Sequence, residues 1–95
     1  MYSLRVLSKG EVSDLSKGFN LGGKPFSVYV RSKSATEIVS DTLLNCKLIC
    51  DNSFGNIPVP VGDWTPAAIV AIAPNAIDLQ KYEIYWGAGE IIRNN

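Results

Sequence analysis

Short segments of alternating apolar and polar residues recur along the chain and are separated by Gly, Pro and Asn. In the clearest segment, Phe26, Val28 and Val30 alternate with Ser27, Tyr29 and Arg31. Because successive side chains of a strand point to opposite faces, this pattern predicts a strand with Phe26, Val28 and Val30 buried and Tyr29 outside. A further strand is expected upstream, over Ser3–Ser8.

Residues 42–50 alternate in the same way and predict a second half-buried strand. Its apolar side would carry Leu44, Cys46, Leu48 and Cys50. Residues 51–56, which are mostly short polar residues with one glycine, are typical of a turn. We therefore expect a hairpin whose second arm is Ile57–Val61. Since Pro58 and Pro60 cannot donate a backbone hydrogen bond, this arm belongs at the edge of a sheet or in an extended segment.

The most apolar stretch is Pro66–Pro74. Its alanines favour a helix, but only seven residues separate the two prolines, and that length suits a strand buried on both faces. Lys81–Trp86 alternates again and predicts another strand, with Ile84 and Trp86 on its inner face. We expect Gly87–Gly89 to turn the chain into a short last element.

Six to seven short strands with close turn signals predict an all-β fold, either a small antiparallel β-sandwich or a jelly-roll-like barrel. A length of 95 residues corresponds to a single domain, 1–95. The apolar share of 46% and the charged share of 19% are typical of a folded globular domain. The expected core residues are Phe26, Val28, Val30, Leu48, Ile84 and Trp86.

The charge balance and the missing histidine exclude several classes of function. Nine basic residues offset nine acidic residues, so the chain lacks the basic excess of a nucleic-acid-binding protein. Because the chain has no His, it lacks the commonest general base and the commonest metal ligand. No Gly-x-Ser-x-Gly motif occurs either. We expect no enzymatic activity, no metal and no cofactor.

No segment of the sequence predicts contact with a membrane. The first residues lack the apolar run of a signal peptide. The most apolar stretch, Pro66–Pro74, is much shorter than the about 20 residues that a transmembrane helix needs.

Cys46 and Cys50 are the two cysteines of the chain. On one strand their Cα atoms would lie roughly 13 Å apart, which is beyond the reach of a disulfide. We expect two free thiols, both buried on the same face of the strand, because free cysteines are often buried as small apolar residues. Free thiols in turn favour a reducing compartment for folding.

Two further motifs suggest chemistry only weakly. Asp51 and Asp63, with neighbouring asparagines, offer oxygen ligands for Ca²⁺ or for a sugar. Their spacing matches no known calcium loop, and roles in turns are the favoured interpretation. Gly87-Ala88-Gly89 is not a phosphate-binding loop, since only six residues follow it and such a loop must open a helix.

Aromatic residues offer two more interpretations. Trp64 and Tyr85 are candidates for stacking on a sugar, in a carbohydrate-binding β-sandwich module. Tyr and Trp are also enriched at contacts between proteins, where they bury a large area. In the simplest alternative, Trp86 belongs to the core and Trp64 covers a sheet edge. The predicted interface consists of Tyr29, Ile57, Val59, Val61, Trp64 and Tyr85.

The order of the motifs between residues 17 and 87 resembles a known class of protein. A Val-Pro-x-Gly turn within Ile57–Pro66 precedes the apolar strand Ala67–Ala73, and a later strand, Glu83–Trp86, ends in an aromatic residue. Upstream, Lys24–Val30 matches an early strand that enters the sheet after a loop. In this order and spacing the chain resembles the small all-β spike-base, fibre-base and head-decoration proteins of tailed bacteriophages.

The resemblance implies a non-enzymatic structural component of a virion, which decorates the capsid or forms the base of a head spike or fibre. Its partners would be capsid, fibre or spike proteins, and it would be made in the cytoplasm of the host bacterium before it joins the particle. A chain of this size has a narrow margin of stability, so we also expect a homo-oligomer. The alternative is the carbohydrate-binding module described above.

Overall fold

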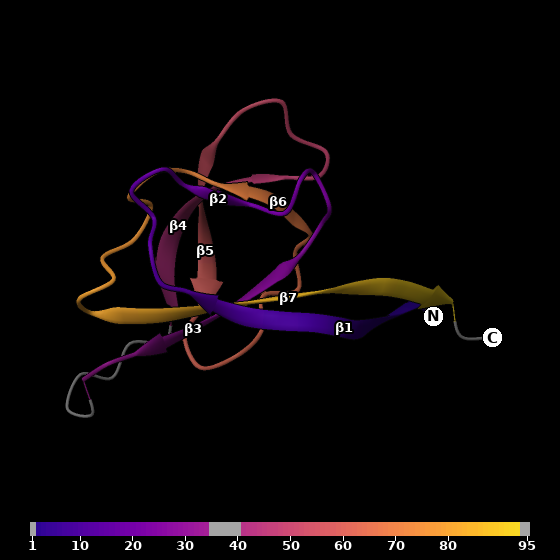
Figure 1. Cartoon of the computed structure of the whole chain (residues 1–95), viewed down its shortest axis with the longest axis horizontal. Coiled ribbons are helices and arrows are strands. Elements are labelled where there is room, and N and C mark those ends of the chain that lie inside the picture. The colour runs from indigo at the N-terminus through magenta and orange to yellow at the C-terminus, as the bar shows by residue number, and fades with distance from the viewer. Residues whose placement is uncertain (1, 35–40, 94–95) are drawn as a thin grey trace.

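The structure describes residues 2–34 and 41–93, and its regular elements are all strands. The structure, a computed structural model, contains seven strands in two sheets that pack face to face (Figure 1). They are β1 (Tyr2–Val12), β2 (Phe19–Asn20), β3 (Ser27–Ser32), β4 (Asp41–Leu48), β5 (Gly55–Pro60), β6 (Ile69–Ile72) and β7 (Tyr82–Arg93). Every pairing between these strands is antiparallel, and the predicted all-β sandwich is confirmed.

The first sheet has the order β1-β7-β3. β7 pairs with β1 from Val12↔Ile84 to Tyr2↔Arg93, with a bulge between Val6 and Ser8. β3 pairs with β7 only as far as Ser27↔Gly87. Beyond Gly87, β1 and β7 therefore continue as a two-stranded ribbon, which extends past the rest of the sandwich (Figure 1). The molecule is accordingly elongated, with extents of 43 × 27 × 21 Å.

The turn predicted at Gly87–Gly89 is wrong, because these residues lie within β7. Gly87 is paired with Lys9 and with Ser27, one residue on each side of it. Gly89 is paired with Val6 of β1. Glycine permits a turn but does not require one, and here a partner strand far away in the sequence holds the backbone extended.

The second sheet has the order β2-β6-β4-β5. β4 and β5 form the predicted hairpin, with pairing from Asp41↔Pro60 to Cys46↔Gly55. β5 lies at the edge of the sheet, as Pro58 and Pro60 predicted. The apolar stretch between the prolines forms the short strand β6, so strand and not helix is the correct interpretation.

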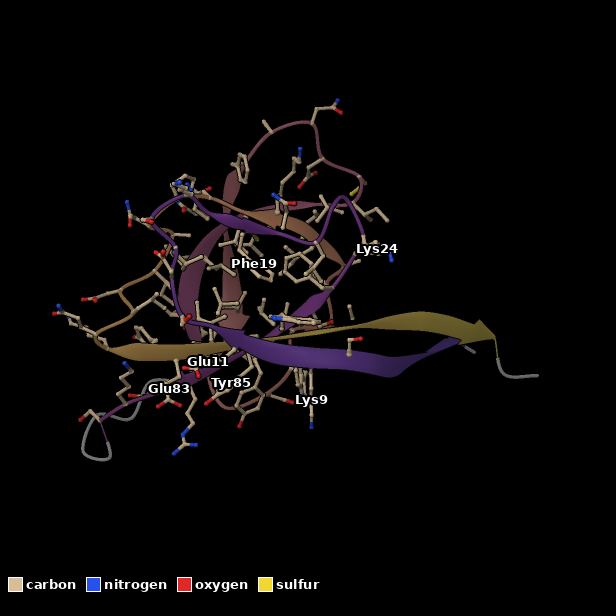
Figure 2. The ribbon with its side chains drawn as sticks, in the orientation of Figure 1. Lys9, Glu11, Phe19, Lys24, Glu83 and Tyr85 are labelled. Atoms are coloured by element: carbon tan, nitrogen blue, oxygen red, sulfur yellow. The ribbon has the colours of Figure 1, made fainter. Side chains whose placement is uncertain are left out.

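The core lies between the two sheets. Its buried members are Val12, Leu15, Phe26, Val28, Val30, Leu44, Cys46, Val59, Ile69, Ile72 and Ile84. The predictions for Phe26, Val28, Val30 and Ile84 are confirmed, whereas Leu48 and Trp86 are half-buried against the core. Phe19 lies between the sheets (Figure 2), with its ring edge-on to that of Phe26 at 5.4 Å between centroids.

The two cysteines are both free, but they do not share a buried face. Cys46 is buried, as predicted, while the prediction for Cys50 is wrong because its side chain is exposed. The regular alternation ends with β4 at Leu48, after a register irregularity between Lys47 and Leu48. The chain then turns, and the Asp51 amide donates a hydrogen bond to the Leu48 carbonyl at 3.0 Å.

Candidate binding face

A row of side chains crosses the outer surface of the three-stranded sheet. Tyr85, near the middle of that sheet, is opposite Glu11 of β1 on one side and opposite Tyr29 of β3 on the other. The adjacent Ile84 points inward and is fully buried, so Tyr85 points outward. Figure 2 shows Tyr85, Glu11 and Lys9 on the side of this sheet that faces away from β2 and β6.

Trp64 reaches the same surface from the loop that follows β5. This loop runs along the edge of β3, because the Gly62 amide donates to the Val30 carbonyl at 2.7 Å and the Thr65 amide donates to the Val28 carbonyl at 2.9 Å. Isolated bridges link Tyr29 with Trp64 and Val30 with Val61. These contacts cover the second edge of β3 and place the Trp64 ring beside that of Tyr29.

The three aromatic rings are in contact. The ring centroids of Tyr29 and Trp64 are 5.5 Å apart, and those of Tyr29 and Tyr85 are 6.4 Å apart. Together with Lys9, Gly10 and Glu11 they line a surface hollow of about 520 Å³. Trp64 is 38% exposed, so its ring is available to a partner. We call this surface the aromatic face and define it by Lys9, Glu11, Tyr29, Trp64 and Tyr85.

The hydroxyl group of Tyr85 is held by a neighbour on its own strand. It donates a hydrogen bond to Oε2 of Glu83 at 2.9 Å. This bond, partial desolvation and the negative charges of Glu83 and Glu11 raise the pKa of Tyr85 above its ordinary value, against an opposing effect of Arg31. The phenol is therefore neutral at physiological pH and has a defined orientation. Charged groups of both signs surround it.

The structure brings together three of the six predicted interface residues, namely Tyr29, Trp64 and Tyr85. The other three, Ile57, Val59 and Val61, do not belong to the aromatic face. Val59 is only 1% exposed and is part of the core, and Ile57 and Val61 are half-buried against it. The assignment of Val59 to an exposed interface is wrong, because an edge strand still packs one of its two faces on the core.

Lys9 and Glu11 were not predicted, because their strand was expected to end at Ser8. Their charges two residues apart, on either side of Gly10, are the signal that could have found them. Gly10 is required at this point, since a Cβ atom there would lie 2.9 Å from Nε1 of the Trp86 indole on the inner side. The absence of a side chain lets Trp86 pack directly beneath the aromatic face.

A second hollow, of about 560 Å³, lies where the ribbon leaves the sandwich, and Lys24, Trp86 and Ala88 are among its lining residues. Among residues 2–34 and 41–93, no three His, Cys, Asp or Glu side chains are grouped as a metal site. Within the same residues, no helix has the length and apolar character needed to cross a membrane. The candidate ligand Asp63 instead accepts a hydrogen bond from the Trp64 amide at 2.8 Å.

Comparisons of this chain with family models, with curated proteins and with solved structures find no match. The class that the structure defines is a small antiparallel β-sandwich. Because one fold supports many functions, the function has to be inferred from the chemistry of the aromatic face.

Proposed function

We propose that this chain is a non-enzymatic structural component of a bacteriophage particle, and that it binds a capsid, spike or fibre protein through the aromatic face. The observation that carries the proposal is the grouping of Tyr29, Trp64 and Tyr85 on the outside of one sheet. Tyr and Trp dominate the binding energy of many interfaces, because they bury a large area at a small cost in side-chain entropy. Lys9 and Glu11 would provide the polar rim.

The sequence resemblance connects this binding surface with a virion. The segment with the greatest resemblance, Ile57–Pro66, contains most of β5 and the loop that brings Trp64 to the aromatic face. The segment that carries the resemblance to small virion proteins is therefore also the segment that completes the binding surface. A single segment supports both the proposed class and the proposed mode of binding.

The cysteine chemistry supports a role without catalysis. The Cys46 thiol is enclosed in the core, where burial, with a smaller contribution from the charge of Asp51, raises its pKa to about 11. A thiol with such a pKa is protonated at neutral pH and is a poor nucleophile. The chain has no His to act as its base.

The proposal is tested with particles of the phage that encodes the chain. Mass spectrometry of purified particles should detect the chain in a fixed ratio to the capsid protein. Particles that lack the gene should then bind the purified, labelled chain on sedimentation. Trp64→Ala should weaken this binding by at least about tenfold, as expected for an exposed tryptophan that buries a large area in an interface.

Phe54→Ala is the matched control, because Phe54 is an aromatic residue with 46% exposure on the β4–β5 turn, outside the aromatic face. This variant should bind particles as the wild type does. Circular dichroism must show the same β-sheet signal for both variants. Absence of the chain from purified particles, or equal binding by Trp64→Ala, would contradict the proposal.

A carbohydrate-binding module is the second candidate, and the hollow of about 520 Å³ favours it. Its rings offer stacking surfaces, and the side chains of Lys9 and Glu11 offer a donor and an acceptor for sugar hydroxyl groups. A glycan array with the wild type, Trp64→Ala and Phe54→Ala separates the two candidates. Binding that only Trp64→Ala loses would support the module, whereas a wild type that binds no glycan excludes it.

A further inference from the structure

The outer edge of β1 is open in the part of the chain that the structure describes. β1 is the end strand of the order β1-β7-β3, and none of the described strands pairs with its outer side. The unpaired backbone groups of such an edge are a template for another strand. Figure 1 shows β1 at the rim of its sheet, with no ribbon segment drawn in front of it.

Two of the other three edges are protected, and the third, that of β2, is only two residues long. The far edge of β3 bonds to Gly62 and Thr65 of the loop after β5. The edge strand β5 contains Pro58 and Pro60, which cannot donate hydrogen bonds to a further strand. By contrast, the 11 residues of β1 include no proline. The chain therefore leaves one long strand edge open to pairing within the part that the structure describes.

We propose that β1 pairs with β1 of a second copy of this chain, antiparallel and around a twofold axis at Gly10. The two three-stranded sheets would then form one continuous six-stranded sheet. In this register, Lys9 is opposite Glu11 of the second copy, and Glu11 is opposite Lys9 of the second copy. The contact is isologous, as in most homodimers.

The charges of β1 select this register. Lys9 and Glu11 are both exposed and are two residues apart, so they project from the same face of the strand. A twofold axis at Gly10 forms two pairs of opposite charge, whereas an axis at Lys9 or Glu11 would place like charges opposite each other. An axis at Ser8 would bring the pairing across the bulge between Val6 and Ser8. Of the four centres from Ser8 to Glu11, Gly10 is the one that avoids both problems.

Such a dimer would place two aromatic faces side by side. Tyr85 is on the strand next to β1, so two β1 strands would separate Tyr85 of one copy from Tyr85 of the other. Three strand spacings amount to about 14 Å. The dimer would form whether or not the chain belongs to a virion, so a failed particle experiment and a failed dimer experiment are distinct results.

Sedimentation equilibrium of the full chain, from micromolar to millimolar concentration, tests the proposal. The wild type should show a monomer–dimer equilibrium. Lys9→Glu should raise the dissociation constant by at least about tenfold, because two attractive cross-strand pairs become repulsive. The exchanged variant, Lys9→Glu with Glu11→Lys, keeps the net charge of the wild type and should restore the dimer.

Lys17→Glu is the control for net charge, since Lys17 is exposed and lies beyond the end of β1. It should dimerise like the wild type. The proposal is overturned by a wild type that stays monomeric over the whole range, by equal effects of Lys9→Glu and Lys17→Glu, or by an exchanged variant that does not dimerise. Circular dichroism establishes that each variant retains the sandwich.

Discussion

Gly18 occupies a position where an added methyl group should destabilise the fold strongly. It lies in the turn before β2 with φ of 78°, and a Cβ atom there would be 2.6 Å from the carbonyl oxygen of Ile72. That oxygen belongs to the backbone of β6, which pairs with β2 at Phe19↔Ile72. The clash cannot be relieved by rotating a side chain, so the Gly18→Ala variant must shift the turn or weaken this pairing.

The magnitude follows from two separate costs. A left-handed backbone costs an L-residue about 1–2 kcal/mol. Steric overlap in a packed region adds about 1–3 kcal/mol. Alanine also lowers the conformational entropy of the unfolded chain relative to glycine, and this effect stabilises the folded protein by only about 0.4–1 kcal/mol. We expect Gly18→Ala to lower the free energy of unfolding by about 2–4 kcal/mol, a large part of the 5–15 kcal/mol typical of a domain.

Two other glycines separate these costs. Gly22 also has a positive φ, 68°, but nothing lies within 4 Å of its added Cβ, so Gly22→Ala should cost about 1 kcal/mol. Gly55 has neither a positive φ nor a neighbour within 4 Å, so Gly55→Ala should be close to neutral. The difference in free energy of unfolding between Gly18→Ala and Gly22→Ala then measures the contact of the Gly18 turn with β6.

Urea unfolding followed by tryptophan fluorescence gives the three free energies, and thermal unfolding gives an independent order. In a domain of this size, 1 kcal/mol corresponds to about 4–8 °C in Tm. The expected order of destabilisation is Gly18→Ala, then Gly22→Ala, then Gly55→Ala. A Gly18→Ala variant no less stable than Gly22→Ala would refute the close packing of the turn against Ile72.

The remaining predictions concern titratable groups. Alkylation of the native protein should label the exposed Cys50 at once and Cys46 only after unfolding, as read by mass spectrometry; equal labelling would contradict the burial of Cys46. The pKa of Cys46 is raised from 9.0 to about 11, so its neutral thiol should contribute fully to the stability of the fold below pH 9. This contribution should be lost as the pH rises through the folded pKa. The Cys46→Val variant should not show this loss. The raised pKa of Tyr85 should appear in an ultraviolet titration as a phenol that ionises late, and Tyr85→Phe should remove this signal. The stability that the neutral Tyr85 phenol contributes should be present below pH 10 and lost as the pH rises through the folded pKa. Glu83→Gln should lower the pKa of Tyr85, and an unchanged titration would show that their hydrogen bond does not form.

Alternation along the sequence predicted the strands that pack one face on the core. Phe26, Val28 and Val30 are buried as expected, because their strand presents one face to the opposite sheet. The length of β1 and β7 was not predictable from local signals. Residues 8–12 are mostly polar or small, and Gly87–Gly89 has the composition of a turn, yet the two segments hold each other extended. Pairing between the two ends of the chain decided their structure.

In the candidate site too, local alternation predicted some positions and tertiary contacts decided the others. Tyr29 and Tyr85 were expected on the outside because they alternate with buried neighbours. In the structure they lie directly opposite each other on the adjacent strands β3 and β7. The position of Trp64 depends on hydrogen bonds from its loop to β3, which no local pattern specifies. Val59 was misassigned because its proline neighbours correctly indicated an edge, but an edge strand has an inner face too. Residue type predicted the chemistry, and tertiary pairing decided which residues meet.

The ribbon formed by the ends of β1 and β7 begins next to the segment of β1 that the proposed dimer would use. Beyond Ser27↔Gly87, each of these strands has only the other as a partner, and an isolated two-stranded ribbon is at best marginally stable in water. With the axis at Gly10, residues 8–12 of the two β1 strands would lie opposite each other, so the second copy would border the ribbon only at Ser8. Because β1 also supplies Lys9 and Glu11 to the aromatic face, the same contact would fix the rim of that face. The shape of the binding surface would then be a property of the dimer, whereas the ribbon beyond Ser8 would depend on the pairing of β1 with β7 alone.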